Sequence, residues 1–167
     1  LPHDADVPPA VPDGARVVRA EPHSPQLPVR PLCDLLDAAE SVRAFAPAVV
    51  PRQVDCYRRN VVDGDTTAEL VLTDPVIDRL VSDFRSELTA SLRTPRLHVR
   101  RAGSATPPFS LVVAERPAGP EMGLLVYADR GVEGFVGNDD PAAVAWARER
   151  LNDCWASATP LARLDDA

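Results

Sequence analysis

The chain has 167 residues, 45% of them hydrophobic, which is enough for one domain with a sizeable core. No apolar run reaches membrane-spanning length and the polar, proline-rich start is not a signal peptide, so we expect a cytoplasmic protein with no membrane partner. The formal net charge of −7 argues against a chain that binds nucleic acid by itself, because neutralised phosphates supply most non-specific affinity.

The first half of the chain alternates short strands with amphipathic helices. Residues 1–14 come before them, and their prolines and aspartates favour an extended linker or tail. Apolar residues then recur either in short runs or at helical spacing. The predicted elements are a strand over 15–20, a helix over 32–39, a strand over 42–49, a short helix over 54–61 and a strand over 68–72.

The second half begins with a helix start at Asp74-Pro75, because a carboxylate can cap the first turn and proline suits the first helical position. One helix is predicted from there through Leu88, with its apolar residues on a single face. Asp140-Pro141 repeats the same start for a last helix that ends near Trp155. Between the two helices we expect strands over 97–100, 109–114, 123–128 and 131–136, the last two as a hairpin.

This order predicts an α/β fold. Strands that alternate with helices indicate a parallel sheet with crossover connections, and the later strands extend it as hairpins. We therefore expect a mixed sheet that is only partly parallel.

No residue pattern indicates catalysis or metal binding. Ser110 lies in an apolar strand without a nucleophile-elbow motif, and His98 alternates with apolar residues as at a solvent-facing or edge position. The acid pairs are predicted to cap a helix (Asp139-Asp140), make a turn (Asp63 and Asp65) and end the chain (Asp165-Asp166). None has the spacing of a calcium loop, so we expect no metal and no cofactor.

The three cysteines are Cys33, Cys56 and Cys154. They are odd in number, far apart and without a C-x-x-C pair, so neither a zinc site nor a disulfide framework is indicated. Each falls in a predicted helix, and we expect three buried free thiols.

A ligand site is predicted where the parallel strands end. In open α/β sheets, ligands bind outside the carboxyl ends of the strands. The loops at that edge place five residues as candidates for ligand binding, with ordinary loop structure as the alternative for each. They are His23, Ser24, Pro47, Thr73 and Phe109.

The chain resembles the effector-sensing domain of archaeal winged-helix transcription regulators, in the family named for the middle domain of a methanogenesis regulatory protein. The resemblance runs from residue 15 to residue 161. It depends on four segments: RVVRAEPHSPQLPVRPLCDLLDAAESVRAFAPAVVP, AELVLTDPVIDRL, PPFSLVVAE and, most specific, GLLVYADRGVEGFVGNDDPAAVAWARERLNDCWASATPL.

This resemblance implies a regulatory sensor domain over residues 15–161, followed by a tail over 162–167. It implies an unknown small-molecule effector, a homodimer, and DNA binding only through an N-terminal winged helix that this chain lacks. An exposed helix face with Trp146 and Trp155 is a candidate dimer surface. The chain has no lysine, and Asp outnumbers Glu by about two to one. That composition fits a haloarchaeal, salt-adapted protein, with a GC-rich genome as the alternative explanation.

The resemblance also implies half of a phospholipase D fold, an open three-layer sandwich. Phospholipase D chemistry needs an H-x-K-x-x-x-x-D motif, and the strand where it would lie reads Phe109-Ser110-Leu111-Val112-Val113. Since histidine and lysine are both missing there, we expect a protein that is not an enzyme. Two alternatives stay open: a small-molecule hydrolase on a degenerate scaffold of this kind, and a purely structural interaction module.

Overall fold

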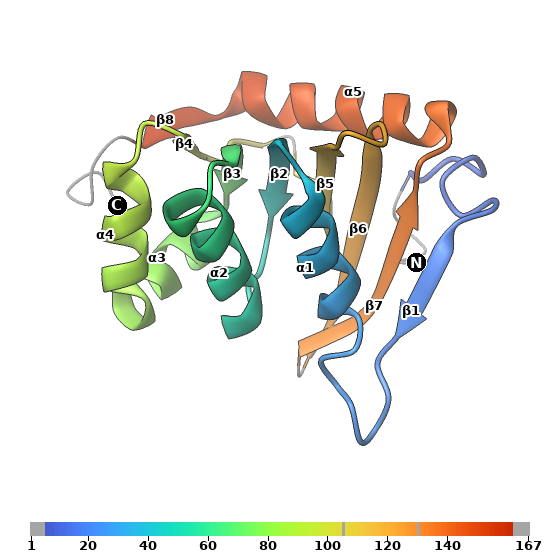
Figure 1. The fold of residues 1–167 in the computed structure, drawn as a ribbon, viewed down its shortest axis with the longest axis horizontal. Helices are drawn as coiled ribbons and strands as arrows, with labels where there is room; N and C mark the ends of the chain where they lie inside the picture. Colours follow the sequence, from blue (N-terminus) through green and yellow to red (C-terminus); the bar gives the residue numbers. More distant parts are fainter. Residues whose placement is uncertain (1–5, 105, 130, 162–167) are drawn as a thin grey trace.

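One mixed sheet forms the middle of the fold (Figure 1). The computed structural model describes residues 6–104, 106–129 and 131–161. Within them the strands are β1 (Arg16–Arg19), β2 (Ser41–Ala46), β3 (Thr67–Leu72), β4 (Leu97–Arg101), β5 (Ser110–Glu115), β6 (Glu121–Ala128), β7 (Gly131–Asn138) and β8 (Thr159–Leu161). Their order across the sheet is β1-β7-β6-β5-β2-β3-β4-β8.

Among the described strands, parallel pairing is confined to β2, β3 and β4, which are neighbours toward the β8 edge of the sheet. The other neighbours pair antiparallel, and β6 and β7 form the predicted hairpin. The expectation that the parallel arrangement begins with the first strand is wrong in one respect, because β1 is not a neighbour of β2, β3 or β4. That strand lies at the far edge of the sheet, antiparallel to β7, because its partner comes from the other end of the chain.

Helices cover both faces of the sheet, so the fold is the expected three-layer α/β sandwich (Figure 1). One face carries α1 (Val29–Ala38), α2 (Pro51–Arg58), the π-helix η1 (Arg59–Asp63), α3 (Asp74–Asp83) and α4 (Arg85–Arg93). The other face carries α5 (Pro141–Ser157) alone.

The side of the sheet under α5 is closely packed. Alternating residues of β2, β5 and β6 point to it, including Phe45, Leu111 and Leu124, each at most 1% exposed. α5 begins as predicted: the Asp140 side chain accepts a hydrogen bond from the Ala142 amide at 2.9 Å, with Pro141 in the first turn. This pair of acids therefore caps a helix.

The Trp146 and Trp155 face of α5 is not the exposed surface we expected. Both indoles are partly buried against the core under α5; Trp146 lies beside Phe109, and Arg100 lies over Trp155. The one large hydrophobic side chain exposed among the described residues is Val17, on β1.

The predicted helix over residues 74–88 is two helices. Phe84, with φ −133° and ψ 35°, ends α3 and precedes α4. Apolar spacing continues across the break, which is why the pattern indicates one helix. The change of direction brings α4 against α2 and η1 while Leu80 and Leu88 stay in the same core cluster.

Part of the segment expected as a linker packs on the domain. Val11 is fully buried under the α5 side, and the Asn138 side-chain amide donates to the carbonyls of Ala10, Val11 and Asp13. The domain boundary at residue 15 stays a prediction. The predicted tail at 162–167, which includes the Asp165-Asp166 pair, lies outside the described residues.

Candidate functional site

A cavity of about 70 Å³ lies between the helices and the parallel strands, where α2, η1, α3 and α4 meet β2, β3 and β4. Apolar side chains make up most of its wall, among them Ala46, Leu72, Leu88 and Val99. The polar side chains that line it are Gln53, Tyr57, Arg58, Glu87 and Ser91. A cavity of this size can hold several water molecules or one compact organic molecule.

Gln53 is the most deeply buried polar residue of the cavity wall, 3% exposed. Its Oε1 accepts a hydrogen bond from the Val50 amide at 3.0 Å and lies 3.2 Å from the Tyr127 hydroxyl. An amide N–H can only donate, so the Val50 contact determines which end of the Gln53 amide is oxygen. The Nε2 group is therefore a donor, and it has no protein partner among the described residues.

Tyr57 follows Gln53 by one helical turn and lines the same cavity. Its hydroxyl has no hydrogen-bond partner among the residues that the structure describes. Burial raises the pKa of Tyr57 well above that of an ordinary tyrosine, and the nearby Tyr127 raises it further. The phenol is thus neutral near pH 7 and able to donate.

Tyr127 belongs to a satisfied polar cluster beside the cavity. Its hydroxyl is 2.9 Å from the Ala48 carbonyl and contacts the Ser110 hydroxyl. Burial raises the pKa of Tyr127, while the hydrogen bonds with Ser110 and Gln53 oppose that rise. The cluster contacts the Gln53 side chain through the Tyr127 hydroxyl.

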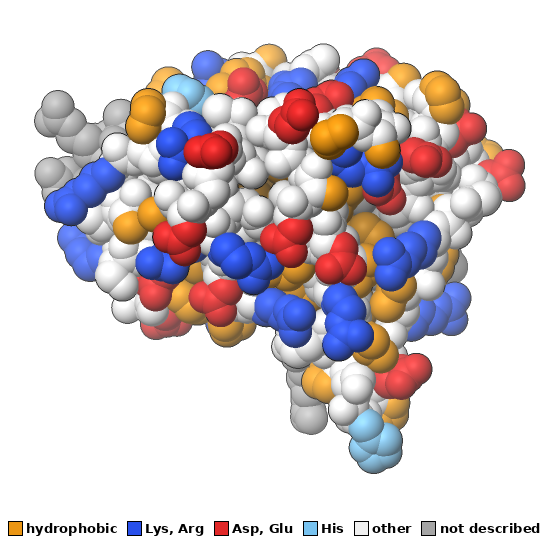
Figure 2. Space-filling view, in the orientation of Figure 1, with side chains coloured by type: hydrophobic (Ala, Val, Ile, Leu, Met, Phe, Trp, Pro, Cys, Tyr) orange, Lys and Arg blue, Asp and Glu red, His pale blue; other side chains and the backbone are white. Residues whose placement is uncertain are grey.

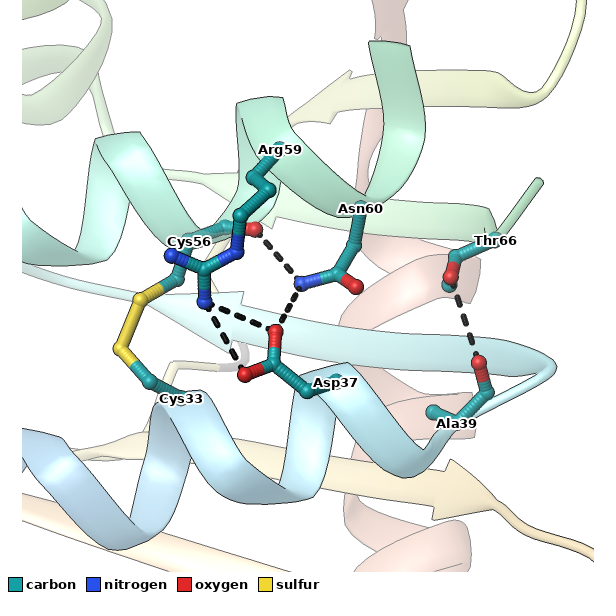
Figure 3. A network of polar contacts seen from close by, with 7 residues as sticks. All are labelled: Cys33, Asp37, Ala39, Cys56, Arg59, Asn60 and Thr66. Atoms are coloured by element: carbon teal, nitrogen blue, oxygen red, sulfur yellow. Dashed lines mark hydrogen bonds and ion pairs between the residues drawn. A yellow bond between two sulfur atoms is a disulfide. The ribbon is translucent and has the colours of Figure 1, made fainter. Parts of the chain in front are cut away.

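The helix that carries Tyr57 is fastened to α1 by a disulfide between Cys33 and Cys56, whose Cα atoms are 5.6 Å apart (Figure 3). The expectation of free thiols at these positions is wrong. The two cysteines are far apart in sequence, but α1 and α2 pack side by side, so the helix pairing brings them together. Cys154 is a buried thiol, as predicted, and burial raises its pKa.

A polar network lies next to the disulfide, centred on Asp37 of α1 (Figure 3). The carboxylate accepts hydrogen bonds from the Arg59 guanidinium at 2.8 and 3.0 Å and from the Asn60 amide at 2.9 Å. Burial acts to raise the pKa of Asp37, but these hydrogen bonds and the charge of Arg59 outweigh it and the pKa is lowered. Together with the disulfide, the network holds α2 and η1 against α1.

The π-helix η1 continues α2 and contributes Val61 to the cavity wall. The Arg96 guanidinium donates to the Val61 carbonyl at 2.7 and 3.1 Å. Short π-helical turns are often found at functional sites. Here the turn links the cavity wall to the network around Asp37.

The structure brings together only two of the residues predicted at the strand ends. The Thr73 hydroxyl lies 3.4 Å from the Pro47 carbonyl. His23 and Ser24 lie in the loop after β1, four strands away from β2, or about 19 Å at the usual strand spacing. Phe109 is 2% exposed in the core under α5. A ligand-binding role for these five residues stays a prediction.

Gln53 and Tyr57 were not predicted as site residues, because Tyr57 lies among apolar residues at helical spacing, as a core residue would. The sequence does contain one indication, a glutamine and a tyrosine one turn apart on an otherwise apolar helix face. Only the packing of α4 shows that this face borders a cavity.

The visible surface carries both signs of charge, with arginine and carboxylate side chains interspersed on the face drawn in Figure 2. Ion pairs among the described residues include Arg43 with Glu69 and Arg79 with Asp83. Within the described ranges, no group of three or more His, Cys, Asp or Glu side chains could hold a metal ion. Nor is any helix in those ranges long and apolar enough to cross a membrane.

Solved structures of similar fold include an archaeal chromatin protein, TrmBL2, described as showing a novel mode of DNA binding, with a TM-score of 0.65 and 16% identity over 88% of this chain. The chain spans 55% of that protein. NucT from Helicobacter pylori has a TM-score of 0.63 and 10% identity, over 88% of this chain and 98% of its own. Nuc from Salmonella typhimurium, a phospholipase D family member, has a TM-score of 0.64 and 11% identity, over 89% and 99%.

At these identities the structures show a shared fold, a phospholipase D-like α/β sandwich. No curated protein matches the sequence. A family model does match, over residues 25–157, and it describes the middle domain of the methanogenesis regulatory protein FilR1. The matched residues include β2 to β7, all of α5 and the whole cavity wall. The chain therefore belongs to the FilR1 middle-domain family of archaeal transcription regulators.

Proposed function

We propose that this chain is the ligand-sensing domain of a transcription regulator and that the cavity between α2, α4 and the parallel strands receives a small-molecule effector. One observation carries the proposal most directly. In a domain of a regulator family, a mainly apolar cavity has two hydrogen-bonding groups, Gln53 Nε2 and the Tyr57 hydroxyl, that no described protein atom satisfies. Every buried side-chain polar atom of the described residues has a partner, so these two groups are reachable by a water-sized molecule, and a ligand or water is their expected partner.

The regulator would bind DNA through a winged helix N-terminal to this domain and act as a homodimer in the cytoplasm. The likeness to TrmBL2, of which this chain spans 55%, supports a larger protein with a separate DNA-binding part. Ligand binding would then change DNA affinity by favouring one arrangement of the two winged helices, a coupling between two sites. The lysine-free, acidic composition supports a salt-adapted protein.

A thermal-shift screen of the chain against metabolite fractions, run in molar KCl and again in low salt, tests the sensing role. A ligand that binds the folded state raises the melting temperature by mass action, by an amount that grows with its concentration. Fractions that raise it are then added to the intact regulator on its DNA. Fractions that stabilise the domain but never change DNA affinity would contradict the proposal.

The same screen separates the two other functions considered. If the chain is a purely structural interaction module, no metabolite should raise its melting temperature at any concentration. If the chain is a hydrolase, it should turn over phosphodiester or ester substrates, and a substrate panel measures that activity directly. The chain has no lysine for phospholipase D chemistry, so we expect uniform inactivity in that panel.

A further inference from the structure

The hydrogen-bonding groups of the cavity restrict the chemistry of its ligand. Because Gln53 Oε1 is occupied by the Val50 amide and the Tyr127 hydroxyl, Gln53 offers the cavity only N–H donors. Tyr57 stays protonated because burial raises its pKa, so its hydroxyl can donate as well. Two donors with no protein acceptor fit an oxygen acceptor on the ligand, and the apolar remainder of the wall fits a hydrocarbon body.

Charge decides between a neutral and an ionised ligand. The ionised side chains that line the cavity are Arg58 and Glu87, of opposite sign. The Arg58 side chain is 43% exposed, so solvent screens its charge. Its guanidinium also lies 3.5 Å from the Asp63 carboxylate, which offsets that charge. Glu87 is only partly exposed, and its negative charge opposes an anion. With no buried cation to compensate, transferring a carboxylate from water into this apolar space is costly.

We infer that the cavity takes a compact, neutral, mainly hydrocarbon molecule with one oxygen acceptor, which receives hydrogen bonds from the Tyr57 hydroxyl and the Gln53 amide. This inference rests on the proposed sensing function for its biological meaning, but its binding chemistry can be measured on the chain alone. A ketone, a lactone or an ether matches these groups in chemistry; a carboxylate, a phosphate or a sugar with many hydroxyl groups does not.

Three probes of similar size test the ligand chemistry: cyclohexanone, methylcyclohexane and cyclohexanecarboxylate. Each is titrated into the 15N-labelled chain, and dissociation constants are taken from amide shifts near Gln53 and Tyr57. We expect cyclohexanone to bind about 10-fold more tightly than methylcyclohexane, since one net hydrogen bond is worth about a factor of ten. Cyclohexanecarboxylate should bind most weakly at pH 7. Binding of the carboxylate as tight as that of the ketone would overturn the inference, and so would no binding by any probe.

Two variants assign the contacts. Tyr57→Phe removes the hydroxyl and keeps the ring, so it should bring the ketone's affinity close to that of the hydrocarbon and leave the hydrocarbon's unchanged. An equal loss for both probes would mean that Tyr57 is not the donor. Ala46→Leu places a larger side chain in the cavity and should abolish binding of all probes, whereas Ala145→Leu, the same change at an exposed position of α5, should abolish none. The Tyr57→Phe variant tests the hydrogen bond from Tyr57 to the ligand even if the Ala46→Leu variant does not fold.

The outcomes separate this inference from the proposed function. If a metabolite fraction stabilises the Ala46→Leu variant as much as the unchanged chain, the sensing role stands but its ligand binds outside this cavity. If ketone binding depends on Tyr57 but no ligand changes the DNA affinity of the intact regulator, the inferred cavity chemistry stands and the sensing role is contradicted.

Discussion

The two faces of the sheet are built differently. α5 runs across one face as a single helix of 17 residues, and the side chains beneath it, such as Phe45 and Leu124, are fully buried. The other face is covered by shorter helices that meet at junctions, with a disulfide at one junction and a cavity at another. The cavity lies where the short helices α2, η1, α3 and α4 meet. The two faces thus differ in how helices cover them, and the proposed ligand cavity lies on the face with the short helices.

The largest expected effect comes from a matched pair of leucines, Leu151 on α5 and Leu88 on α4, both buried. Replacing either by alanine should cost about 2–5 kcal/mol of unfolding free energy. Leu151→Ala should lie near the upper end because its neighbours are closely packed, and Leu88→Ala near the lower end because Leu88 already borders the cavity. Urea unfolding of both variants measures the difference. Equal costs would show that the two faces are packed alike.

Loss of the disulfide between Cys33 and Cys56, by reduction or by the double change to alanine, should lower the unfolding free energy by about 3 kcal/mol, the value for a loop of this length. The reason is that the unfolded chain regains the freedom of the closed loop. Denaturant unfolding with and without a phosphine reductant measures it. The double variant is the control, since the reductant should leave its stability unchanged; a response there would assign the effect to another group.

The same substitution on the two faces should have different costs. Ala147→Leu inserts three carbons into a fully buried position of α5 and should cost about 1–3 kcal/mol. Ala46→Leu adds the same atoms beside existing space and should cost less than about 1 kcal/mol. Thermal unfolding of the two variants compares them. A larger cost at Ala46 would mean that the cavity cannot accept added volume.

The smallest effect concerns the ion pair of Asp37 with Arg59, whose side chains are 45% and 54% exposed. Asp37→Asn should cost less than about 1 kcal/mol at pH 7, because solvent screens such pairs. Since the folded-state pKa of Asp37 is lowered, its contribution is present above the unfolded value of about 4 and is lost as the pH falls through the folded value.

The stability difference between the unchanged chain and Asp37→Asn, measured from pH 7 down to pH 2, tests this sign. It should be constant above about pH 5, shrink below pH 4 and be smaller in molar salt. A difference that grew on acidification would mean that the pKa of Asp37 is raised instead.

Elements defined by neighbouring residues were predictable from the sequence. The β6–β7 hairpin and the start of α5 follow from short patterns, and Asp140 caps the helix as its position before Pro141 indicates. Features that depend on distant segments were not. The partner of β1 is more than a hundred residues away, and β8 is too short to show alternation before it pairs with β4.

The candidate site was harder to predict than the fold for the same reason. The rule for open α/β sheets placed the ligand at the ends of the strands, and it named Pro47 and Thr73, which do lie together. The cavity instead extends along the helical face of β2 to β4, and it exists because the chain changes direction at Phe84. Neither that change of direction nor the pairing of Cys33 with Cys56 has a local sequence pattern.

The Asn138 side chain fixes where the chain enters the domain. Its amide group holds three carbonyls of residues 10–13, and its carbonyl oxygen accepts from the Asp140 amide at the start of α5 (Figure 1 shows this start beside the N-terminal coil). A domain joined upstream of residue 6 would therefore be attached on the α5 side of the sheet, opposite the face that carries the cavity. A movement of the cavity-side helices would reach such a domain through the sheet, because α5 and those helices pack on opposite faces of it.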